Sequence, residues 1–174
     1  MSGTILPYKG VRPTIADDVF IAPTAVVIGD VVIGAGSSVW FNCTVRGDVH
    51  EIRIGERTNI QDGTVVHVTG GKFGTYIGSD ITIGHGAVLH ACTLEDCCFI
   101  GMGATVMDGA VVETGAMVAA GAVVTPGKRV RKGELWAGNP AKLLRELTEA
   151  DIAFFPKSAA NYVALAATYR GEQG

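Results

Sequence analysis

Charged residues, prolines and long apolar runs are all scarce in this 174-residue chain, and each shortage excludes a class of protein. Charged residues make up 18% of the chain, and the net charge of −3 provides no basic surface for a nucleic-acid backbone. The 6 prolines follow no Gly-x-y period, which excludes a collagen-like chain and Pro-rich disorder. No apolar run approaches the ~18 residues that a membrane-spanning helix needs, so we expect no membrane partner.

The four cysteines also lack a functional pattern. Cys43, Cys92, Cys97 and Cys98 include an adjacent pair but no Cys-x-x-Cys, which argues against a secreted disulfide framework and against a thiolate zinc site. The first ten residues have neither a basic start nor an apolar segment, so no signal peptide is expected. We therefore expect reduced cysteines that behave as small core residues in a cytoplasmic protein.

Glycine, in contrast, is abundant, with 24 residues, and aliphatic residues recur every six positions. The series runs from Ile15 to Val124 and is interrupted twice, by three extra residues before Ile54 and by five before Ile77. Neither the 3.6-residue period of a helix nor the two-residue period of a strand explains this spacing. The glycines outside the repeat predict loops at these two interruptions.

The six-residue period predicts an all-β fold, a parallel β-helix of triangular section. Each repeat supplies one short strand and a turn, three repeats make a coil, and glycines fit the corners. Eighteen aliphatic positions give about six coils. We expect a single domain over residues 1–174, with the β-helix over 10–127.

A helical segment over 146–170 is expected to pack on this prism. Thr148 is a suitable N-cap, with Asp151 as the third helical residue. We expect Pro156 to interrupt the helix and Ser158 to cap its continuation.

All four histidines lie between residues 50 and 90, in the region of the interruptions. His67 and His90 each follow a core aliphatic residue and stand one coil apart, so they should project from the same face. Arg46 occupies the same column one coil below, and His50 falls out of column, where we expect it to be solvated. His85 lies on another side of the triangle. In a threefold assembly, His85 would meet the neighbour's His67 and His90, and three imidazoles with an open fourth position are typical of catalytic zinc.

Several motifs resemble those of the γ-class carbonic anhydrase family. They are Arg46-Gly47-Asp48, Asn59-Ile60-Gln61-Asp62-Gly63, Val66-His67 and His85-x4-His90. The similarity covers nearly the whole chain, including Gly138-Asn139-Pro140-Ala141-Lys142. It implies a left-handed β-helix that forms a homotrimer with a metal at each subunit interface. His67, His85 and His90 would be the ligands of Zn²⁺, with Fe²⁺ or Co²⁺ as alternatives.

The resemblance also implies roles for the residues around the metal. Gln61 would orient the metal-bound water, while Arg46 and Asp62 would pair across the interface with Asp48 nearby. Asn59 is either part of this surrounding shell or a turn residue, and we favour the turn. Tyr162 either packs the C-terminal helix, which we favour, or approaches the water on the metal.

The implied reaction is the reversible hydration of carbon dioxide to bicarbonate by a metal-bound hydroxide, a lyase activity. The chain departs from the family where other members carry acidic residues that shuttle protons. It has Val49 after Asp48 and Val68-Thr69-Gly70 after His67, although Glu51 is close in sequence. This difference leaves open a hydratase activity that is weak or absent. Two other functions also remain open, an acyl-CoA transferase or thioesterase of the hexapeptide-repeat type and a non-catalytic metal-binding scaffold trimer.

Overall fold

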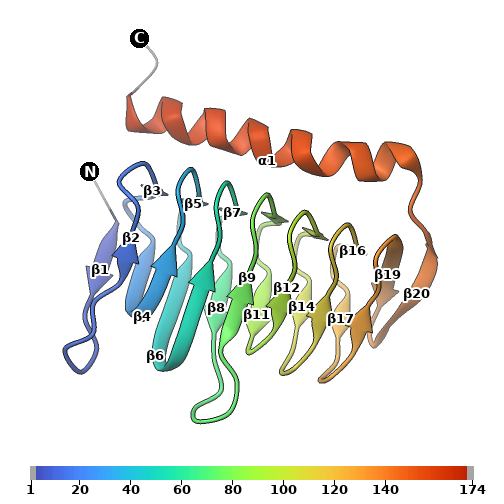
Figure 1. Ribbon diagram of the computed structural model, residues 1–174, viewed down its shortest axis with the longest axis horizontal. Coiled ribbons are helices and arrows are strands. Elements are labelled where there is room, and N and C mark those ends of the chain that lie inside the picture. The colour runs from blue at the N-terminus through green and yellow to red at the C-terminus, as the bar shows by residue number, and fades with distance from the viewer. Residues whose placement is uncertain (1–2, 172–174) are drawn as a thin grey trace.

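The computed structural model describes residues 3–171 and confirms a parallel β-helix with a C-terminal helix (Figure 1). Short strands stack on three faces, which we name the histidine face, the distal face and the helix face. β4 (Val26–Ile33) and β6 (Thr44–Ile54) turn a corner, so each contributes to both the histidine face and the distal face. All ladders are parallel except the last, between β19 and β20. The handedness of the coil stays a prediction.

The three faces contain the following strands. The histidine face stacks β1 (Thr4–Leu6), the first halves of β4 and β6, β8 (Val65–His67), β11 (Val88–His90), β14 (Thr105–Val106) and β17 (Val123–Val124). The distal face stacks β2 (Thr14–Ile15), the second halves of β4 and β6, β9 (Thr75–Ile77), β12 (Thr93–Leu94), β15 (Val111–Val112) and β18 (Arg129–Val130). The helix face stacks β3 (Phe20–Ile21), β5 (Ser38–Val39), β7 (Asn59–Ile60), β10 (Thr82–Ile83), β13 (Phe99–Ile100), β16 (Met117–Val118), β19 (Glu134–Gly138) and β20 (Ala141–Glu146).

Each face therefore holds seven parallel layers, one more than the approximate number of coils expected from the sequence. Ile5 pairs with Val27 although it stands outside the six-residue series. At the other end, Val130 and Trp136 continue the series and pair with Val112 and Val118. The strands thus extend beyond 10–127 in both directions. Basic and aromatic residues hide the repeat after Pro126, but their backbone still adds to the ladders.

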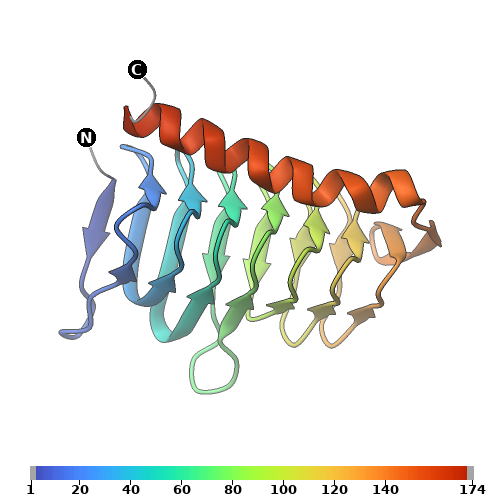
Figure 2. The ribbon, with the colours of Figure 1, turned by 45° about the horizontal axis from the view of Figure 1, so that its top comes forward.

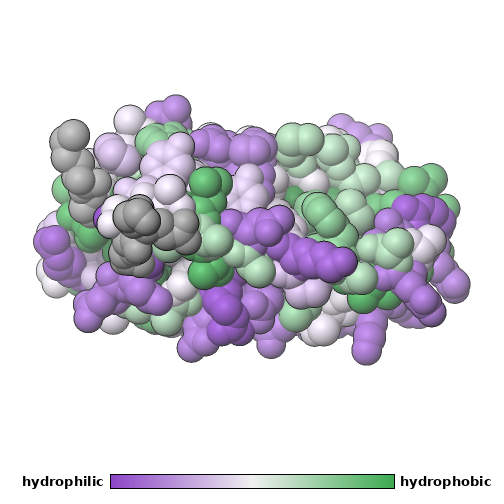
Figure 3. Space-filling view, turned by 90° about the horizontal axis from the view of Figure 1, so that it is seen from above, coloured by the Kyte–Doolittle hydropathy of each residue, from purple (hydrophilic) through white to green (hydrophobic). Residues whose placement is uncertain are grey.

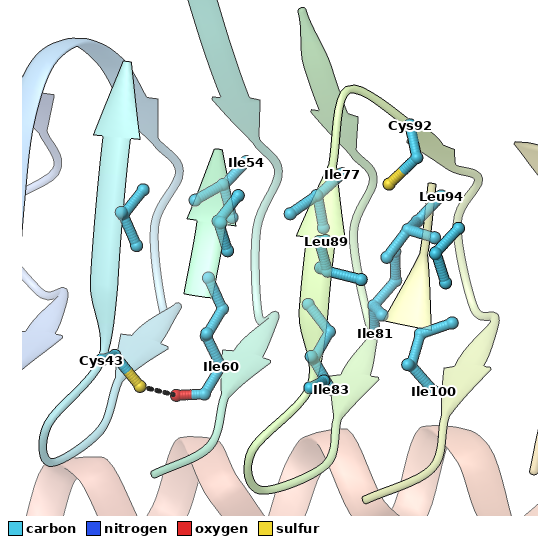
Figure 4. Packing of buried hydrophobic residues seen from close by; sticks show 14 of the residues in the cluster. Cys43, Ile54, Ile60, Ile77, Ile81, Ile83, Leu89, Cys92, Leu94 and Ile100 are labelled. Atoms are coloured by element: carbon cyan, nitrogen blue, oxygen red, sulfur yellow. Dashed lines mark hydrogen bonds between the residues drawn. The ribbon is translucent and has the colours of Figure 1, made fainter. Parts of the chain in front are cut away.

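Inward-pointing aliphatic side chains fill the prism (Figure 4). On the histidine face, Val45, Val66, Leu89 and Val106 form one column, and each is 0% exposed. Because strand side chains alternate in direction, the residues next to this column point outward. Small residues complete the layers. Among them, Cys43 donates its thiol to the carbonyl oxygens of Ile60 and Gln61, and Figure 4 shows the first of these contacts.

The cysteines are free, as expected, and Cys43, Cys92 and Cys98 are buried while Cys97 is half-buried. Burial raises the pKa of the Cys43 thiol to about 11 and that of Cys92 to about 12. Burial also raises the pKa of Cys97, but Cys97 is half-buried whereas the other three cysteines are buried. Since the thiolate is the reactive form and the reagent must reach it, we predict that an aromatic disulfide reagent at pH 8 modifies Cys97 first. Native protein should release about one equivalent of chromophore quickly and the remaining three only on unfolding. Equal rates for all four thiols in native protein would contradict this assignment.

The C-terminal helix, α1 (Glu149–Arg170), lies along the helix face and packs over β3, β5, β7 and β10 (Figures 1 and 2). Thr148 caps it as expected, because the Asp151 backbone N–H donates to Thr148 Oγ1 and the Thr148 backbone N–H donates to Asp151. The expected interruption at Pro156 is wrong, since the helix runs through this residue. Phe155 stacks on Phe99 with ring centroids 5.4 Å apart, and such contacts offset the ~3 kcal/mol that an internal proline costs.

Ser158 does not cap a second helix. It is buried, and its Oγ lies 2.9 Å from Thr82 Oγ1 on β10. Seen from the helix side, hydrophilic and hydrophobic residues are interspersed on this surface (Figure 3). No helix within residues 3–171 is long and apolar enough to cross a membrane.

The two interruptions of the repeat form loops at the corner between the histidine face and the distal face. In the first, Gly47 pairs with Gly29 and Ile52 with Val31, so residues 48–51 bulge out of the ladder. The second contains an antiparallel bridge between Thr69 and Phe73, and it projects below the prism in Figures 1 and 2. Both loops therefore begin next to the outward side chains of the histidine face.

Candidate metal centre

β8 and β11 place His67 and His90 side by side on the histidine face. The two residues are register partners in adjacent strands, directly after the buried Val66 and Leu89. Their ring centroids are 5.2 Å apart, and His67 Nδ1 lies 3.3 Å from His90 Nε2. Two nitrogen ligands at ~2.0–2.1 Å from one tetrahedral ion are themselves separated by ~3.3–3.4 Å. The pair therefore has the spacing that a shared metal ion requires.

The other ring nitrogen of each histidine faces a carboxylate. His67 Nε2 lies 3.1 Å from Asp48 Oδ1, and His90 Nδ1 lies 2.7 Å from Asp108 Oδ1. Histidines that bind metals almost always donate their second ring N–H in this way. When both imidazoles are neutral and donate to these carboxylates, the two nitrogens that face each other both present lone pairs. The arrangement thus favours a cation between them.

Asp48 is held by two partners. Arg46 Nη1 donates to its Oδ2 at 2.6 Å, and His67 contacts its Oδ1. Burial opposes ionisation of Asp48, but the hydrogen bonds from Arg46 and His67 hold its pKa below the usual range. Asp48 is therefore an anion that links Arg46 to a candidate ligand.

Asp108, which the sequence did not mark as a candidate site residue, also contacts one of the candidate ligands. Its Oδ2 accepts a hydrogen bond from the Thr69 hydroxyl, and its Oδ1 contacts His90. The hydrogen bond from Thr69 lowers the pKa of Asp108, and the hydrogen bond from His90 lowers it further. Partial burial acts in the opposite direction, but the pKa stays below its usual range. One signal could have identified it, because Asp108 stands two residues after Val106, which stacks on Leu89. Asp108 nevertheless lies one residue beyond the histidine column, whose position next to Val106 is occupied by Met107.

His85 lies at another corner, after β10, and the structure does not bring it to His67 and His90 within one chain. Its Nδ1 is 2.7 Å from Asp62 Oδ2, and Asp62 lies one coil below, where its carbonyl oxygen accepts the Gly86 N–H. Within residues 3–171, no three His, Cys, Asp or Glu side chains are placed to hold a metal ion. One chain therefore supplies two adjacent imidazoles and a third on a separate surface. The predicted pairing of Arg46 with Asp62 across an interface stays a prediction, because within the chain each contacts another residue.

Gln61, Asn59 and Tyr162 lie on the side of the prism that α1 covers. Asn59 belongs to β7 and is buried, so the preference for a turn residue is wrong. It donates to Ile81 O and Thr82 Oγ1, and it accepts from Gln61 Nε2 at 3.0 Å. Tyr162 is half-buried, with its ring 5.4 Å from that of Trp40, which is the packing role that we favoured. Burial, and then the charge of Asp62, raise the pKa of Tyr162.

The first loop borders a cavity of about 440 Å³ whose lining includes Asp48, His50 and Glu51. His50, which we expected to be solvated, is half-buried, and its Nδ1 accepts the Glu51 backbone N–H. The Glu51 carboxylate forms an ion pair with Arg53 at 2.8 Å and accepts a hydrogen bond from the Tyr76 hydroxyl at 2.8 Å. Neither residue points to a second set of metal ligands.

Comparison with known proteins places these features in a family. The family description "Bacterial transferase hexapeptide (six repeats)" matches residues 12–47. "Gamma carbonic anhydrase 2, mitochondrial" of Arabidopsis thaliana is 52% identical over 174 residues, an alignment that covers 97% of this chain and 63% of the relative. "Probable carbonic anhydrase" of Methanocaldococcus jannaschii is 51% identical over 154 residues and covers 88% of this chain and 96% of the relative.

A solved structure described as a putative acetyltransferase of Bacillus cereus has a TM-score of 0.95 and 38% identity, and it covers 99% of this chain and 100% of that one. The chain spans 63% of the length of the Arabidopsis protein, whose name places that relative in mitochondria. The cytoplasmic location of this chain stays a prediction. The repeat, the histidine column and the high identity to both carbonic anhydrase relatives agree with one another. This chain belongs to the γ-class carbonic anhydrase family of hexapeptide-repeat proteins.

Proposed function

We propose that this protein catalyses the reversible hydration of carbon dioxide to bicarbonate, as a homotrimer with one divalent metal ion at each subunit interface. The observation that supports this most strongly is the pair of imidazole nitrogens that face each other 3.3 Å apart, each ring also contacting a carboxylate. His67 and His90 of one subunit would hold the ion together with His85 of the neighbouring subunit. Nitrogen donors suit Zn²⁺, and Fe²⁺ or Co²⁺ are the alternatives.

The incompleteness of the site within a single chain supports an assembly in which a neighbouring subunit completes it. His85 is exposed at its corner, with its Nδ1 engaged by Asp62, so its Nε2 is available to a neighbour. A metal held by neutral imidazoles keeps its full charge, and this charge is what supplies an acidic water near pH 7. The carboxylates of Asp48 and Asp108 would then keep the ligand rings in the tautomers that present Nδ1 of His67 and Nε2 of His90.

Gln61 and Tyr162 would serve the site from the subunit that supplies His85, since they lie on the same side of the prism as Asp62. Gln61 Nε2 donates to Asn59, which fixes the amide and leaves Oε1 to accept a hydrogen bond from a water. Removal of the proton from the site would be the slow step. Val49 and Val68 cannot accept a proton, and the Glu51 carboxylate already contacts Arg53 and the Tyr76 hydroxyl.

This deficiency gives a specific test. Stopped-flow assays of carbon dioxide hydration by metal-loaded protein, under reducing and anaerobic conditions, should show turnover that rises with imidazole buffer concentration. The buffer would accept the proton that no side chain carries away. A metal-loaded trimer without turnover at any buffer concentration would overturn the proposed reaction and favour a non-catalytic scaffold.

Acyl transfer is the second candidate, favoured by the structural similarity to the putative acetyltransferase. Such an enzyme would use a histidine as general base without a metal. Here His67, His85 and His90 each contact a carboxylate, and His50 Nδ1 already accepts a backbone N–H. Turnover of acyl-CoA by metal-free protein would favour this candidate over hydration.

A further inference from the structure

We infer that Asp108 is a positioning residue that fixes the ring of His90 for metal binding and ties it, through Thr69, to the loop between β8 and β9. The inference rests on the proposed metal site. The two oxygens of the Asp108 carboxylate have different partners, His90 Nδ1 on one side and the Thr69 hydroxyl on the other. The carboxylate cannot rotate away from His90 without also losing Thr69.

The backbone places Asp108 firmly at this point. The Gly109 N–H donates to Ala91 O at 2.8 Å, and the Asp108 carbonyl accepts from the Gly127 N–H at 2.9 Å. Thr69 is also fixed, since its backbone N–H donates to Phe73 O at 3.0 Å across the base of the loop. The hydrogen bonds of Asp108 to His90 and Thr69 therefore connect three successive coils, those of β8, β11 and β14. They also connect the loop between β8 and β9 to one side of the His90 ring.

The charge of Asp108 distinguishes it from Asp48. Asp48 shares its charge with Arg46, whereas Asp108 forms no ion pair with a lysine or arginine in the described part of the chain. Its negative charge therefore acts mainly on His90 Nδ1–H. A hydrogen bond to an anion raises the basicity of the opposite nitrogen, here Nε2, which is the atom that faces His67. Asp108 should strengthen metal binding through charge as well as through orientation.

The test compares the Co²⁺ affinity of full-length variants, measured by competition with a chelator, together with the visible absorption of bound Co²⁺ and the oligomeric state. We expect Asp108→Ala to weaken Co²⁺ binding 10- to 100-fold and to shift the absorption bands. Asp108→Asn should lose less Co²⁺ affinity than Asp108→Ala, because the amide oxygen of asparagine can still accept a hydrogen bond from His90. Thr69→Val should show a smaller loss of a few fold. Asp96→Ala is the matched control, since Asp96 is an exposed carboxylate that contacts the Ser79 backbone and no histidine.

Wild-type affinity and spectrum in Asp108→Ala would overturn the inference, and so would an equal loss in Asp96→Ala. Failure of wild-type protein to bind Co²⁺ would overturn the proposed metal site and the inference together. The expected order of affinities in a protein that does not hydrate carbon dioxide would overturn the proposed reaction alone.

Discussion

Substitution of His90 by alanine is expected to abolish metal binding and to lower carbon dioxide hydration at least ~100-fold, beyond the range typical for loss of an outer-shell partner. His90 supplies one of the two nitrogens that face each other across 3.3 Å. Without it, an ion would keep only His67 and the neighbour's His85. Two imidazoles cannot enforce the three-ligand geometry that leaves one open position for water.

The measurement combines metal content per subunit with stopped-flow hydration under reducing, anaerobic conditions. His50→Ala is the matched control, because it removes a histidine of the same region that contacts no other histidine and belongs to no proposed site. The control should retain both metal and activity. Retention of one metal per subunit and of the wild-type rate by His90→Ala would contradict the proposed role of His90 as a ligand.

The second large effect is expected in the core. Leu89→Ala should lower the free energy of unfolding of the metal-free protein by about 3 kcal/mol, within the ~2–5 kcal/mol range for such truncations. Leu89 is 0% exposed and stacks between Val66 and Val106, so its removal leaves a cavity between two coils. The rigid backbone ladders on both sides limit how far the prism can collapse into that space.

Urea unfolding at one fixed protein concentration measures this difference, because an oligomer's stability depends on concentration. Val32→Ala on the distal face is the control, since Val32 is 37% exposed and its loss should change the free energy of unfolding by no more than ~0.5 kcal/mol. Equal effects of the two substitutions would show that the aliphatic column is not the main stabilising element.

The sequence was sufficient to predict features that depend on counting along the repeat. Because every strand pairs with the strand one coil away, spacing alone predicts that His67 and His90 are neighbours and that His85 is not. The positions of both loops followed from the same count, since extra residues cannot enter a parallel ladder without bulging out of it.

Features that depend on contacts between distant residues were not predictable in this way. Asp108 and Thr69 are 39 residues apart, and their contact depends on the conformation of the loop between β8 and β9, which the repeat does not specify. The helix continues through Pro156 because Phe155 packs on Phe99, a gain that local propensity does not include. Asn59 looked like a turn residue, but its amide satisfies buried groups on the helix face.

The most direct test of the shared metal site is a crystal structure of the metal-loaded protein with anomalous diffraction measured at the metal's absorption edge. We expect one anomalous peak per subunit, between His67 Nδ1 and His90 Nε2 of one chain and His85 of its neighbour. Metal-loaded crystals without a peak between these nitrogens, or with a metal held entirely by one chain, would contradict a shared metal site.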